Sequence, residues 1–384
     1  MVSAPWPPIL GGPDHVIVVV GGGAVGLAVA AALAARDQVL VLEKNHAIGL
    51  ETSSHNSGVI HSGIYYPTGS LKHRLCLEGN RLLYEWAESH SVRTKRLGKI
   101  IVATAHDEID ALEGVLRQAQ ANEVPGIRRL SVPEAGEMEP DLRCVAALYS
   151  ETSGVVDQAG YMRSLASEVA TRGGMVALQH EVTGAGRSGA GFLLEVRDAE
   201  GAESEIECDV LVNSAGLGAT ALSAMLGYDL DGTETTPRLR QGVNKGRYYD
   251  IVTPEKARAL RHLIYPVPQH RQGGLGVHLT LDIDGGAHLG PDTEWLGEGC
   301  EIDYRADDIR GDAFLESARR FLPSLRRSDI APGQVGYRPK LQRPGEDMAD
   351  FLVWHDRGYV HLGGIESPGL TASLAIARHV AALV

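Results

Sequence analysis

The sequence has few phenylalanines and cysteines, and it contains no long apolar run. Only 4 of its 384 residues are phenylalanine, and 4 are cysteine. The cysteines form no CxxC pair, which argues against a disulfide framework or a zinc site and favours a reducing compartment. No apolar run approaches the roughly 18 residues that a membrane-spanning helix needs, and the first residues lack the pattern of a secretory signal. We therefore expect a cytoplasmic protein without a transmembrane segment.

Clustered positive charge is also missing. The chain has 36 lysines and arginines against 49 acidic residues, and its net charge is −13. Because nucleic-acid-binding proteins carry a basic stripe or tail, we expect no nucleic-acid partner. The hydrophobic share of 43% and the charged share of 22% are typical of folded globular proteins. Glycine, by contrast, is abundant at 46 residues, which predicts many tight turns of the kind that approach ligands.

A glycine-rich turn near the amino terminus predicts a dinucleotide site. The pattern predicts a buried strand at 15–20 (HVIVVV), a helix at 24–36 and a second strand at 38–42. Between the first strand and the helix stands the GxGxxG turn Gly21-Gly22-Gly23-Ala24-Val25-Gly26. In such a turn the first glycine permits the tight bend, the second lets the backbone approach a pyrophosphate, and the third lets the helix pack on the strand. The helix start then supplies N–H donors for the phosphates.

An acidic residue at the end of the second strand supports this interpretation. Glu43 lies 22 residues after Gly21, where a carboxylate can accept hydrogen bonds from the adenosine ribose, and we assign Lys44 beside it to the same site. A carboxylate there disfavours NADP, whereas FAD and NAD both remain open. A long polar loop at 49–69 follows instead of another regular βα unit, which favours FAD with its ribityl and isoalloxazine tail.

Several segments carry a resemblance to a known family. They are HNSGVIHSGIYY at 55–66, GGGAVGL at 21–27, LGVHLTLD at 275–282, GYRPKL at 336–341 and GIESPGLTASLAIA at 364–377. Together they resemble the FAD-dependent oxidoreductases of the D-amino-acid oxidase superfamily, and within it the L-2-hydroxyglutarate dehydrogenase/oxidase branch. The resemblance covers nearly the whole chain from about His15. The carboxyl-terminal segment departs from the version typical of that branch, which leaves the substrate open.

The polar loop, a middle turn and the carboxyl-terminal segment supply further candidate FAD-binding residues. Hydroxyl and amide groups at 52–54 can bind phosphate or ribityl oxygens, and the rest of the loop would run along the flavin. A helix starting near Gly369 would direct its N–H groups and dipole at the flavin N1/C2=O edge, where the resembling family accumulates charge on reduction. The segment Ile365-Glu366-Ser367-Pro368-Gly369 is not the GxSxG nucleophile elbow of a serine hydrolase, because Ile365 stands where that motif needs glycine. A serine hydrolase is therefore disfavoured. The candidate FAD-binding residues are Gly21, Gly23, Ala24, Val25, Gly26, Glu43, Lys44, Thr52, Ser53, Ser54, His55, Asn56, Ser57, Gly58, Val182, Ser214, Ala215, Gly216, Arg338, Gly364, Ile365, Glu366, Pro368, Gly369, Leu370 and Thr371.

The proposed chemistry needs a carboxylate clamp and a base. A 2-hydroxy acid is held by its carboxylate and loses its hydroxyl proton while its α-hydrogen leaves as hydride for flavin N5. Arg338 is the candidate clamp because a planar guanidinium binds both carboxylate oxygens, and its GYRP setting resembles a substrate-facing turn of the superfamily. His61 and His278 are the candidate bases, because neutral imidazole accepts a proton near neutral pH. We expect His278 in the middle of a strand.

Further candidates complete the substrate site. Tyr265 could add a hydroxyl donor, and Lys245 or Arg247 could reach a distal carboxylate, with Lys340 as a further alternative to Arg338. No spacing of histidines and acids supports a metal site.

Nucleotide-binding segments at both ends and in the middle, with strand-rich material between them, predict two interleaved domains. The expected α/β fold has a Rossmann-like FAD-binding domain with a doubly wound, mostly parallel sheet and a mixed-sheet α+β substrate domain. After a leader at 1–14, residues 15–90, 150–232 and 344–384 would form the FAD-binding domain. Residues 91–149 and 233–343 would form the substrate domain.

The expected activity is FAD-dependent oxidation of an L-2-hydroxy acid, foremost L-2-hydroxyglutarate, to the 2-oxo acid. The electron acceptor could be oxygen, a quinone or an electron-transfer protein. One alternative is oxidation of an amino acid, an amine or glycerol 3-phosphate on the same scaffold. A second is a flavin-binding module without turnover, which the presence of His61, His278 and Arg338 disfavours.

Overall fold

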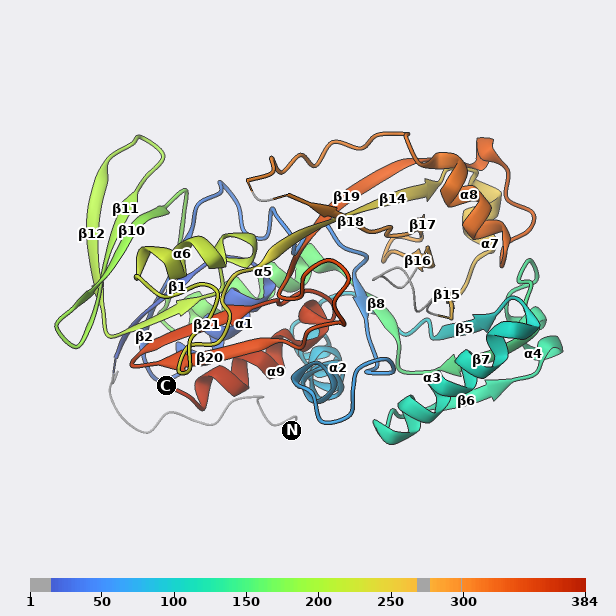
Figure 1. Cartoon of the computed structure of the whole chain (residues 1–384), viewed down its shortest axis with the longest axis horizontal. Helices are drawn as coiled ribbons and strands as arrows, with labels where there is room; N and C mark the ends of the chain where they lie inside the picture. The colour runs from blue at the N-terminus through green and yellow to red at the C-terminus, as the bar shows by residue number, and fades with distance from the viewer. Residues whose placement is uncertain (1–14, 268–276, 298) are drawn as a thin grey trace.

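The structure is a computed structural model that describes residues 15–267, 277–297 and 299–384. The predicted leader at 1–14 and the first two residues of the LGVHLTLD segment lie outside the described residues. Two large sheets dominate the described part (Figure 1). Each sheet has its own apolar core, and the predicted α/β fold is confirmed.

The first large sheet has six strands in the order β20-β21-β13-β1-β2-β9. All neighbouring strands run parallel except β20, which pairs antiparallel with β21 at one edge. Such parallel strands are buried on both faces and therefore consist of continuous apolar runs, as VIVVV in β1 illustrates. The strands are β1 (Val16–Val20), β2 (Gln38–Glu43), β9 (Met175–Leu178), β13 (Val210–Asn213), β20 (Leu352–Asp356) and β21 (Tyr359–Gly363).

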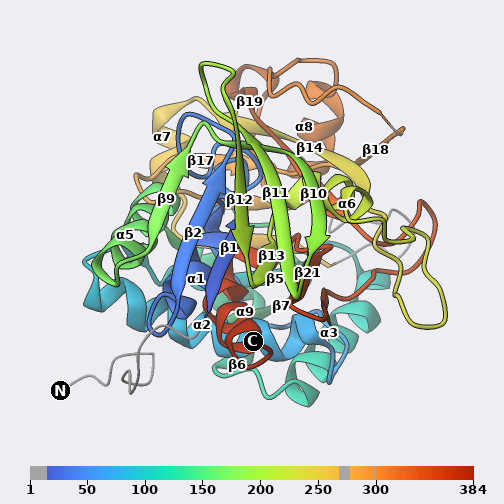
Figure 2. The same cartoon turned by 90° about the vertical axis from the view of Figure 1, so that its left-hand side faces the viewer.

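Helices pack on one face of this sheet, and a small antiparallel sheet packs on the other. The helix α1 contacts both α9 and α5, and α9 also contacts α2. The sheet β10-β11-β12 packs its apolar side chains on the opposite face, as Figure 2 shows from the side. The helices of this layer are α1 (Ala24–Leu33), α2 (Leu71–Ser89), α5 (Gln158–Thr171) and α9 (Gly369–Ala381). The strands of the small sheet are β10 (Glu181–Ser188), β11 (Gly191–Arg197) and β12 (Glu203–Cys208), and α6 (Ala219–Met225) contacts β10 beside them.

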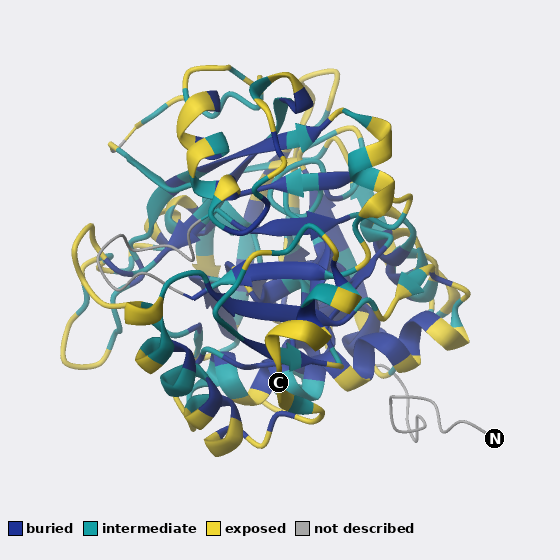
Figure 3. Cartoon of the chain, turned by 90° about the vertical axis from the view of Figure 1, so that its right-hand side faces the viewer, coloured by how far each residue is buried: buried dark blue, intermediate teal, exposed yellow. Residues whose placement is uncertain are grey.

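The second large sheet has nine strands, in the order β18-β14-β17-β16-β15-β5-β7-β6, with β19 paired to β14. It is mixed, since β15 and β5 are parallel while most other pairs are antiparallel. Its buried strands lie at the centre of Figure 3, with exposed helical segments around them. The strands are β5 (Lys99–Ala103), β6 (Ile127–Leu130), β7 (Ala146–Ser150), β14 (Gly242–Ile251), β15 (Leu263–Pro266), β16 (Leu279–Leu281), β17 (Ala287–Leu289), β18 (Glu294–Leu296) and β19 (Ile330–Lys340), and the helices beside them are α3 (Ile109–Ala121), α4 (Val132–Met138), α7 (Pro254–Ala259) and α8 (Gly311–Arg319).

A small sheet in the order β3-β8-β4 completes the described strands. It consists of β3 (Val59–Ile60), β8 (Gly154–Val156) and β4 (Thr94–Lys95). The strands of the six-stranded sheet come from three separated stretches of the chain, but the division into two domains stays a prediction.

One local prediction is wrong. His278 was expected in mid-strand, but β16 begins at Leu279 and His278 precedes it. The alternating pattern around His278 extends further than the backbone pairing, because burial of alternate side chains does not require a strand partner.

No helix within the described ranges has the length and apolar character to cross a bilayer.

Candidate functional site

A cavity of about 1170 Å³ lies where residues from both large sheets meet. Its lining includes the GxGxxG turn, the polar loop that follows β2, the end of β19 and the start of α9. Of the residues predicted for the site, those that line the cavity are Gly23, Ala24, Val25, Gly26, Thr52, Ser53, His55, Asn56, Ser57, His61, Ser214, Gly216, Tyr265, His278, Arg338, Lys340, Ile365, Glu366, Pro368, Gly369, Leu370 and Thr371. Predicted residues outside the lining are Gly21, Glu43, Lys44, Ser54, Gly58, Val182, Ala215, Gly364, Lys245 and Arg247.

The glycine turn has the geometry that its sequence predicts. Gly21 has φ of 109°, which favours glycine, and a Cβ there would lie 2.5 Å from the carbonyl oxygen of Ser214. At Gly23 a Cβ would lie 2.8 Å from the hydroxyl of Ser53. That hydroxyl also accepts a hydrogen bond of 3.0 Å from the N–H of Ala24, the first residue of α1. The start of α1 therefore faces the cavity with little room for any side chain at Gly23.

Glu43 supports the glycine turn directly. One of its carboxylate oxygens accepts a hydrogen bond of 2.8 Å from the backbone N–H of Gly22, and the other accepts two from Asn45. Glu43 is buried and does not line the cavity, so its predicted contact with a ribose stays a prediction. Lys44 forms an ion pair of 2.7 Å with Glu51 instead of pointing into the cavity.

The polar loop between β2 and β3 joins the two large sheets. The Thr52 hydroxyl donates to the carbonyl of Tyr337 on β19 at 3.1 Å, and Gln334 on the same strand donates to the carbonyl of Asn56 at 2.9 Å. The Asn56 side chain holds the loop itself, because its amide donates to the carbonyls of Thr52 and Ser53. The loop that the sequence assigns to the cofactor is thus bonded to a strand of the substrate sheet.

His61 lies against the start of α9, more than 300 residues away in the sequence. Its backbone N–H donates to the hydroxyl of Thr371 at 3.0 Å, and its ring Nε2 lies 3.2 Å from the hydroxyl of Ser367. Burial, followed by the charges of Lys99 and His278, holds the pKa of His61 well below its ordinary value. A neutral imidazole in the cavity wall can accept a proton.

His278 and Tyr265 form a second group in the wall. Their ring centroids are 3.8 Å apart. The Tyr265 hydroxyl and that of Tyr65, which also lines the cavity, have no hydrogen-bond partner among the residues that the structure describes. Such buried hydroxyls are ready to bind a polar ligand.

Arg338 is held by neutral groups. Its guanidinium donates to the side-chain oxygen of Asn244 at 2.5 Å and to the backbone carbonyl of Asp292 at 2.9 Å. Within the described ranges it forms no ion pair, and its side chain lines the cavity. Arg338 therefore presents to whatever the cavity binds a positive charge that no ion pair among the described residues neutralises.

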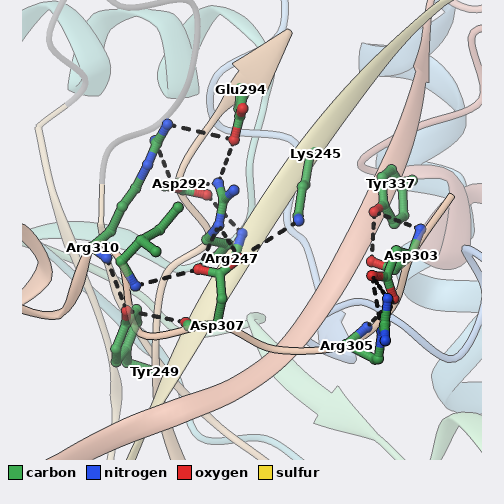
Figure 4. A network of polar contacts seen from close by, with 11 residues as sticks. Lys245, Arg247, Tyr249, Asp292, Glu294, Asp303, Arg305, Asp307, Arg310 and Tyr337 are labelled. Carbon is green, nitrogen blue, oxygen red and sulfur yellow. Dashed lines mark hydrogen bonds and ion pairs between the residues drawn. The ribbon is translucent and has the colours of Figure 1, made fainter. Parts of the chain in front are cut away.

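Arg247 is placed quite differently from the sequence prediction. It is buried and forms ion pairs with Glu294 at 2.5 Å, Asp307 at 3.4 Å and Asp292 at 3.5 Å, as Figure 4 shows. Lys245 lies 3.9 Å from Asp307 in the same network. Because Arg247 is paired with three carboxylates, Lys245 lies near one, and neither side chain lines the cavity, the structure gives them no access to a substrate carboxylate.

Two buried lysines that the sequence reasoning did not connect share one carboxylate at the cavity wall. Glu366 lies 3.1 Å from Nζ of Lys72 on α2 and 2.7 Å from Nζ of Lys340 at the end of β19. Burial alone would raise the pKa of Glu366, but the two ammonium groups outweigh burial and hold it below its ordinary value. Glu366 is thus an anchor for three segments, and Lys340 is neutralised by it.

The cavity suits a dinucleotide with an additional small ligand. Its volume exceeds the roughly 300–1,000 Å³ of pockets for drug-sized ligands. The amino-terminal ends of α1 and α9 both open onto it, and the positive end of a helix dipole favours negative charge at such a place. A Cβ at Gly216 would meet nothing within 4 Å, so the backbone there is open to a ligand. The residues present fit FAD.

Comparison with known proteins agrees with this geometry. Residues 17–383 match the family described as FAD dependent oxidoreductase. The chain belongs to this family of oxidoreductases, and FAD is its cofactor.

Particular relatives are also recognisable. The mitochondrial L-2-hydroxyglutarate dehydrogenase of Arabidopsis thaliana is 38% identical over 408 residues, which cover 95% of this chain and 82% of the relative. The human protein of the same name is 33% identical over 414 residues, covering 95% of this chain and 87% of the relative. The solved structure of an L-alpha-glycerophosphate oxidase from Mycoplasma pneumoniae with FAD bound has a TM-score of 0.82 at 26% identity, and the match covers 96% of this chain and 94% of that one. The predicted resemblance is confirmed.

The predicted cytoplasmic location is contradicted. The plant and human relatives are both named as mitochondrial. Unpaired cysteines indicate only a reducing environment and not the compartment that provides it, so composition could not decide this point.

Proposed function

We propose that this protein oxidises an L-2-hydroxy acid, foremost L-2-hydroxyglutarate, to the corresponding 2-oxo acid. The names of the Arabidopsis and human relatives support this substrate. The observation that carries the proposal is the Arg338 guanidinium, a cation in the cavity wall whose contacts within the described ranges are to neutral acceptors. A carboxylate bound there would supply the missing negative charge.

FAD would be held by the segments that line the cavity on the side of the six-stranded sheet. The start of α1 and the Ser53 hydroxyl would face its phosphates, and the start of α9 with Thr371 would face its ring. When bound, FAD supplies the acceptor for the hydrogen and electron pair that leave the substrate carbon.

The protein's own part in the reaction is to hold the carboxylate and move one proton. Arg338 would fix the substrate, and a neutral His61 or His278 would take the proton of the hydroxyl group as the C=O bond forms. Desolvation of His61 in the cavity wall favours the neutral form of its imidazole. The Tyr265 hydroxyl would donate to a substrate oxygen.

The test is anaerobic mixing of the purified yellow protein with a panel of substrates while the visible flavin absorbance is followed. The panel contains L-2-hydroxyglutarate, D-2-hydroxyglutarate, L-glutamate and glycerol 3-phosphate. We expect fast bleaching with the L-hydroxy acid alone. Bleaching by glycerol 3-phosphate or the amino acid without bleaching by either hydroxy acid would overturn the proposal. Reoxidation of the bleached protein by oxygen, by a quinone analogue or by an electron-transfer flavoprotein then identifies the class of acceptor.

A further inference from the structure

Lys99 is a buried lysine beside the proposed site. It lies on β5 between β7 and β15, and only 1% of its surface is exposed. Its Nζ lies 3.9 Å from the ring centroid of Tyr265 and 5.8 Å from that of Tyr65. In the described part of the chain no carboxylate forms an ion pair with it.

An unpaired ammonium group is costly to bury. Removing a charge from water without a partner costs several kcal/mol, and the usual outcome is a carboxylate partner or a changed protonation state. The buried Lys72 and Lys340 have such a partner in Glu366, whereas Lys99 lies over the faces of two tyrosine rings and has no carboxylate partner among the described residues. A cation over a ring face is stabilised by the ring quadrupole, but by less than an ion pair in the same setting.

The groups around Lys99 belong to the wall of the cavity or lie just behind it. Tyr265 separates Lys99 from His278, since the Tyr265 ring contacts both. The titratable groups that Lys99 contacts are the Tyr265 phenol on β15 and the Tyr65 phenol in the loop after β3. Its charge also interacts with the His61 imidazole and with the Cys76 thiol on α2.

We propose that Lys99 is a positioning residue for the oxidation, resting on the function proposed above. Its ammonium group holds the Tyr265 ring against His278, and its positive charge adds to burial in favouring the uncharged form of His61, which can accept the substrate proton. Lys99 itself touches neither the reacting carbon nor the hydroxyl.

The electrostatics support this geometry. Burial lowers the pKa of Lys99 to about 7. Below that pH Lys99 is charged, and its charge adds to burial in lowering the pKa of His61. Removing the Lys99 charge must therefore raise the pKa of His61, and any step that needs neutral His61 must begin at higher pH.

The experiment compares Lys99→Met, which removes the charge, with Lys99→Arg, which retains it. The matched control is Lys95→Met, an exposed lysine on β4. In the FAD-loaded protein without substrate, the His61 ring is titrated by side-chain ¹⁵N NMR, with the signal assigned from His61→Asn. The pH dependence of flavin reduction by L-2-hydroxyglutarate is then measured by anaerobic stopped flow.

We expect Lys99→Met to raise the His61 midpoint by more than half a pH unit and to move the low-pH limb of the rate in the same direction. The His61 midpoint of Lys99→Arg should stay much closer to that of the wild type, and the midpoint of Lys95→Met should equal that of the wild type. A His61 midpoint that does not move in Lys99→Met, or a ring that stays neutral down to pH 5 in both proteins, would overturn the proposal. So would loss of folded, FAD-loaded protein in both Lys99 variants, because Lys99 would then be a residue of the folded core. The NMR titration needs no substrate, so failure of the proposed activity and failure of the Lys99 role give different results.

Discussion

At the scale of single residues, Arg338 and Arg247 show how the same side chain takes opposite roles. Arg247 forms ion pairs with three carboxylates, which compensate its positive charge. Arg338 instead donates hydrogen bonds to an amide oxygen and a backbone carbonyl, which are neutral. Only the second arrangement leaves a positive charge for an anionic ligand. The partners of an arginine decide its function, and the sequence around it does not reveal them.

Arg338→Ala should raise the KM for the hydroxy acid at least tenfold and leave FAD content unchanged. Removing one partner of a desolvated charge pair costs about 2 to 5 kcal/mol, and Arg338→Lys should recover only part of the loss because the planar fork is missing. Steady-state kinetics with both variants measure this. Arg305→Ala, at a side chain that is 88% exposed, is the control. A wild-type KM in both Arg338 variants would show that the substrate carboxylate is held elsewhere.

The two histidines should respond differently to substitution. His61 contacts Ser367 and Thr371 beside the start of α9, so His61→Ala should change both the flavin spectrum and the rate of flavin reduction. His278 packs on Tyr265, so His278→Ala should change the rate alone. A general base contributes about 10² to 10⁴ in rate. Anaerobic stopped flow across pH measures both rates, and a loss below tenfold in each variant would mean that the proton goes to another group.

At the scale of elements, the starts of α1 and α9 meet the cavity for different local reasons. The GxGxxG turn brings α1 close to the sheet, and Ser53 covers the first helical N–H. The start of α9 is tied to the loop after β3 through Thr371. Both helix ends therefore depend on the polar loop between β2 and β3 or its continuation.

Gly23→Val should abolish FAD binding while the protein still folds. A Cβ at Gly23 already lies 2.8 Å from the Ser53 hydroxyl, and the larger side chain would project into the space at the start of α1. The visible absorbance per protein and the far-UV circular dichroism of the purified variant measure the two properties. Gly136→Val, where a Cβ meets nothing within 4 Å, is the control. Full flavin occupancy in Gly23→Val would show that the cofactor does not approach this turn.

Glu366→Gln should destabilise the protein at neutral pH, because it leaves Lys72 and Lys340 buried without their carboxylate. Breaking a buried pair in this way costs about 3 to 5 kcal/mol. The folded-state pKa of Glu366 is lowered, so its contribution is present above the unfolded pKa of about 4.3 and is lost as the pH falls through the lower folded value. Urea unfolding of variant and wild type should therefore differ at pH 7, and the difference should begin to shrink only as the pH falls below about 4.3. Glu137→Gln on the exposed side of α4 is the control, and an equal difference at all pH values would contradict this account.

Elements with strong local patterns could be predicted from the sequence. The apolar run at 15–20, the glycine turn and the following helix agree with β1 and α1, because continuous apolar runs and glycine spacing are local properties. The start of β16 was placed wrongly, since strand pairing is not local. The roles of Lys72 and Lys99 were missed for the same reason. Glu366 lies 294 residues from Lys72, and Tyr265 reaches Lys99 only because β15 pairs with β5.

At the scale of the whole molecule, the cavity exists because strands of both large sheets end beside one another. The loop after β2 bonds to β19, and Glu366 joins α2, β19 and the turn before α9. These connections hold the side predicted to bind FAD against the side with Arg338, His278 and Tyr265. The family match over residues 17–383 agrees with an arrangement in which nearly the whole chain builds one site.

The most direct test of the central claim is a single turnover with L-2-hydroxyglutarate under anaerobic conditions. The absorbance of the bound flavin and the amount of 2-oxoglutarate are measured in the same sample, with normal substrate and with substrate deuterated at C2. The account predicts one 2-oxoglutarate per FAD bleached and slower bleaching with the deuterated acid, because the C2–H bond breaks in that step. A flavin that stays yellow with L-2-hydroxyglutarate, or that bleaches without forming 2-oxoglutarate, would contradict it.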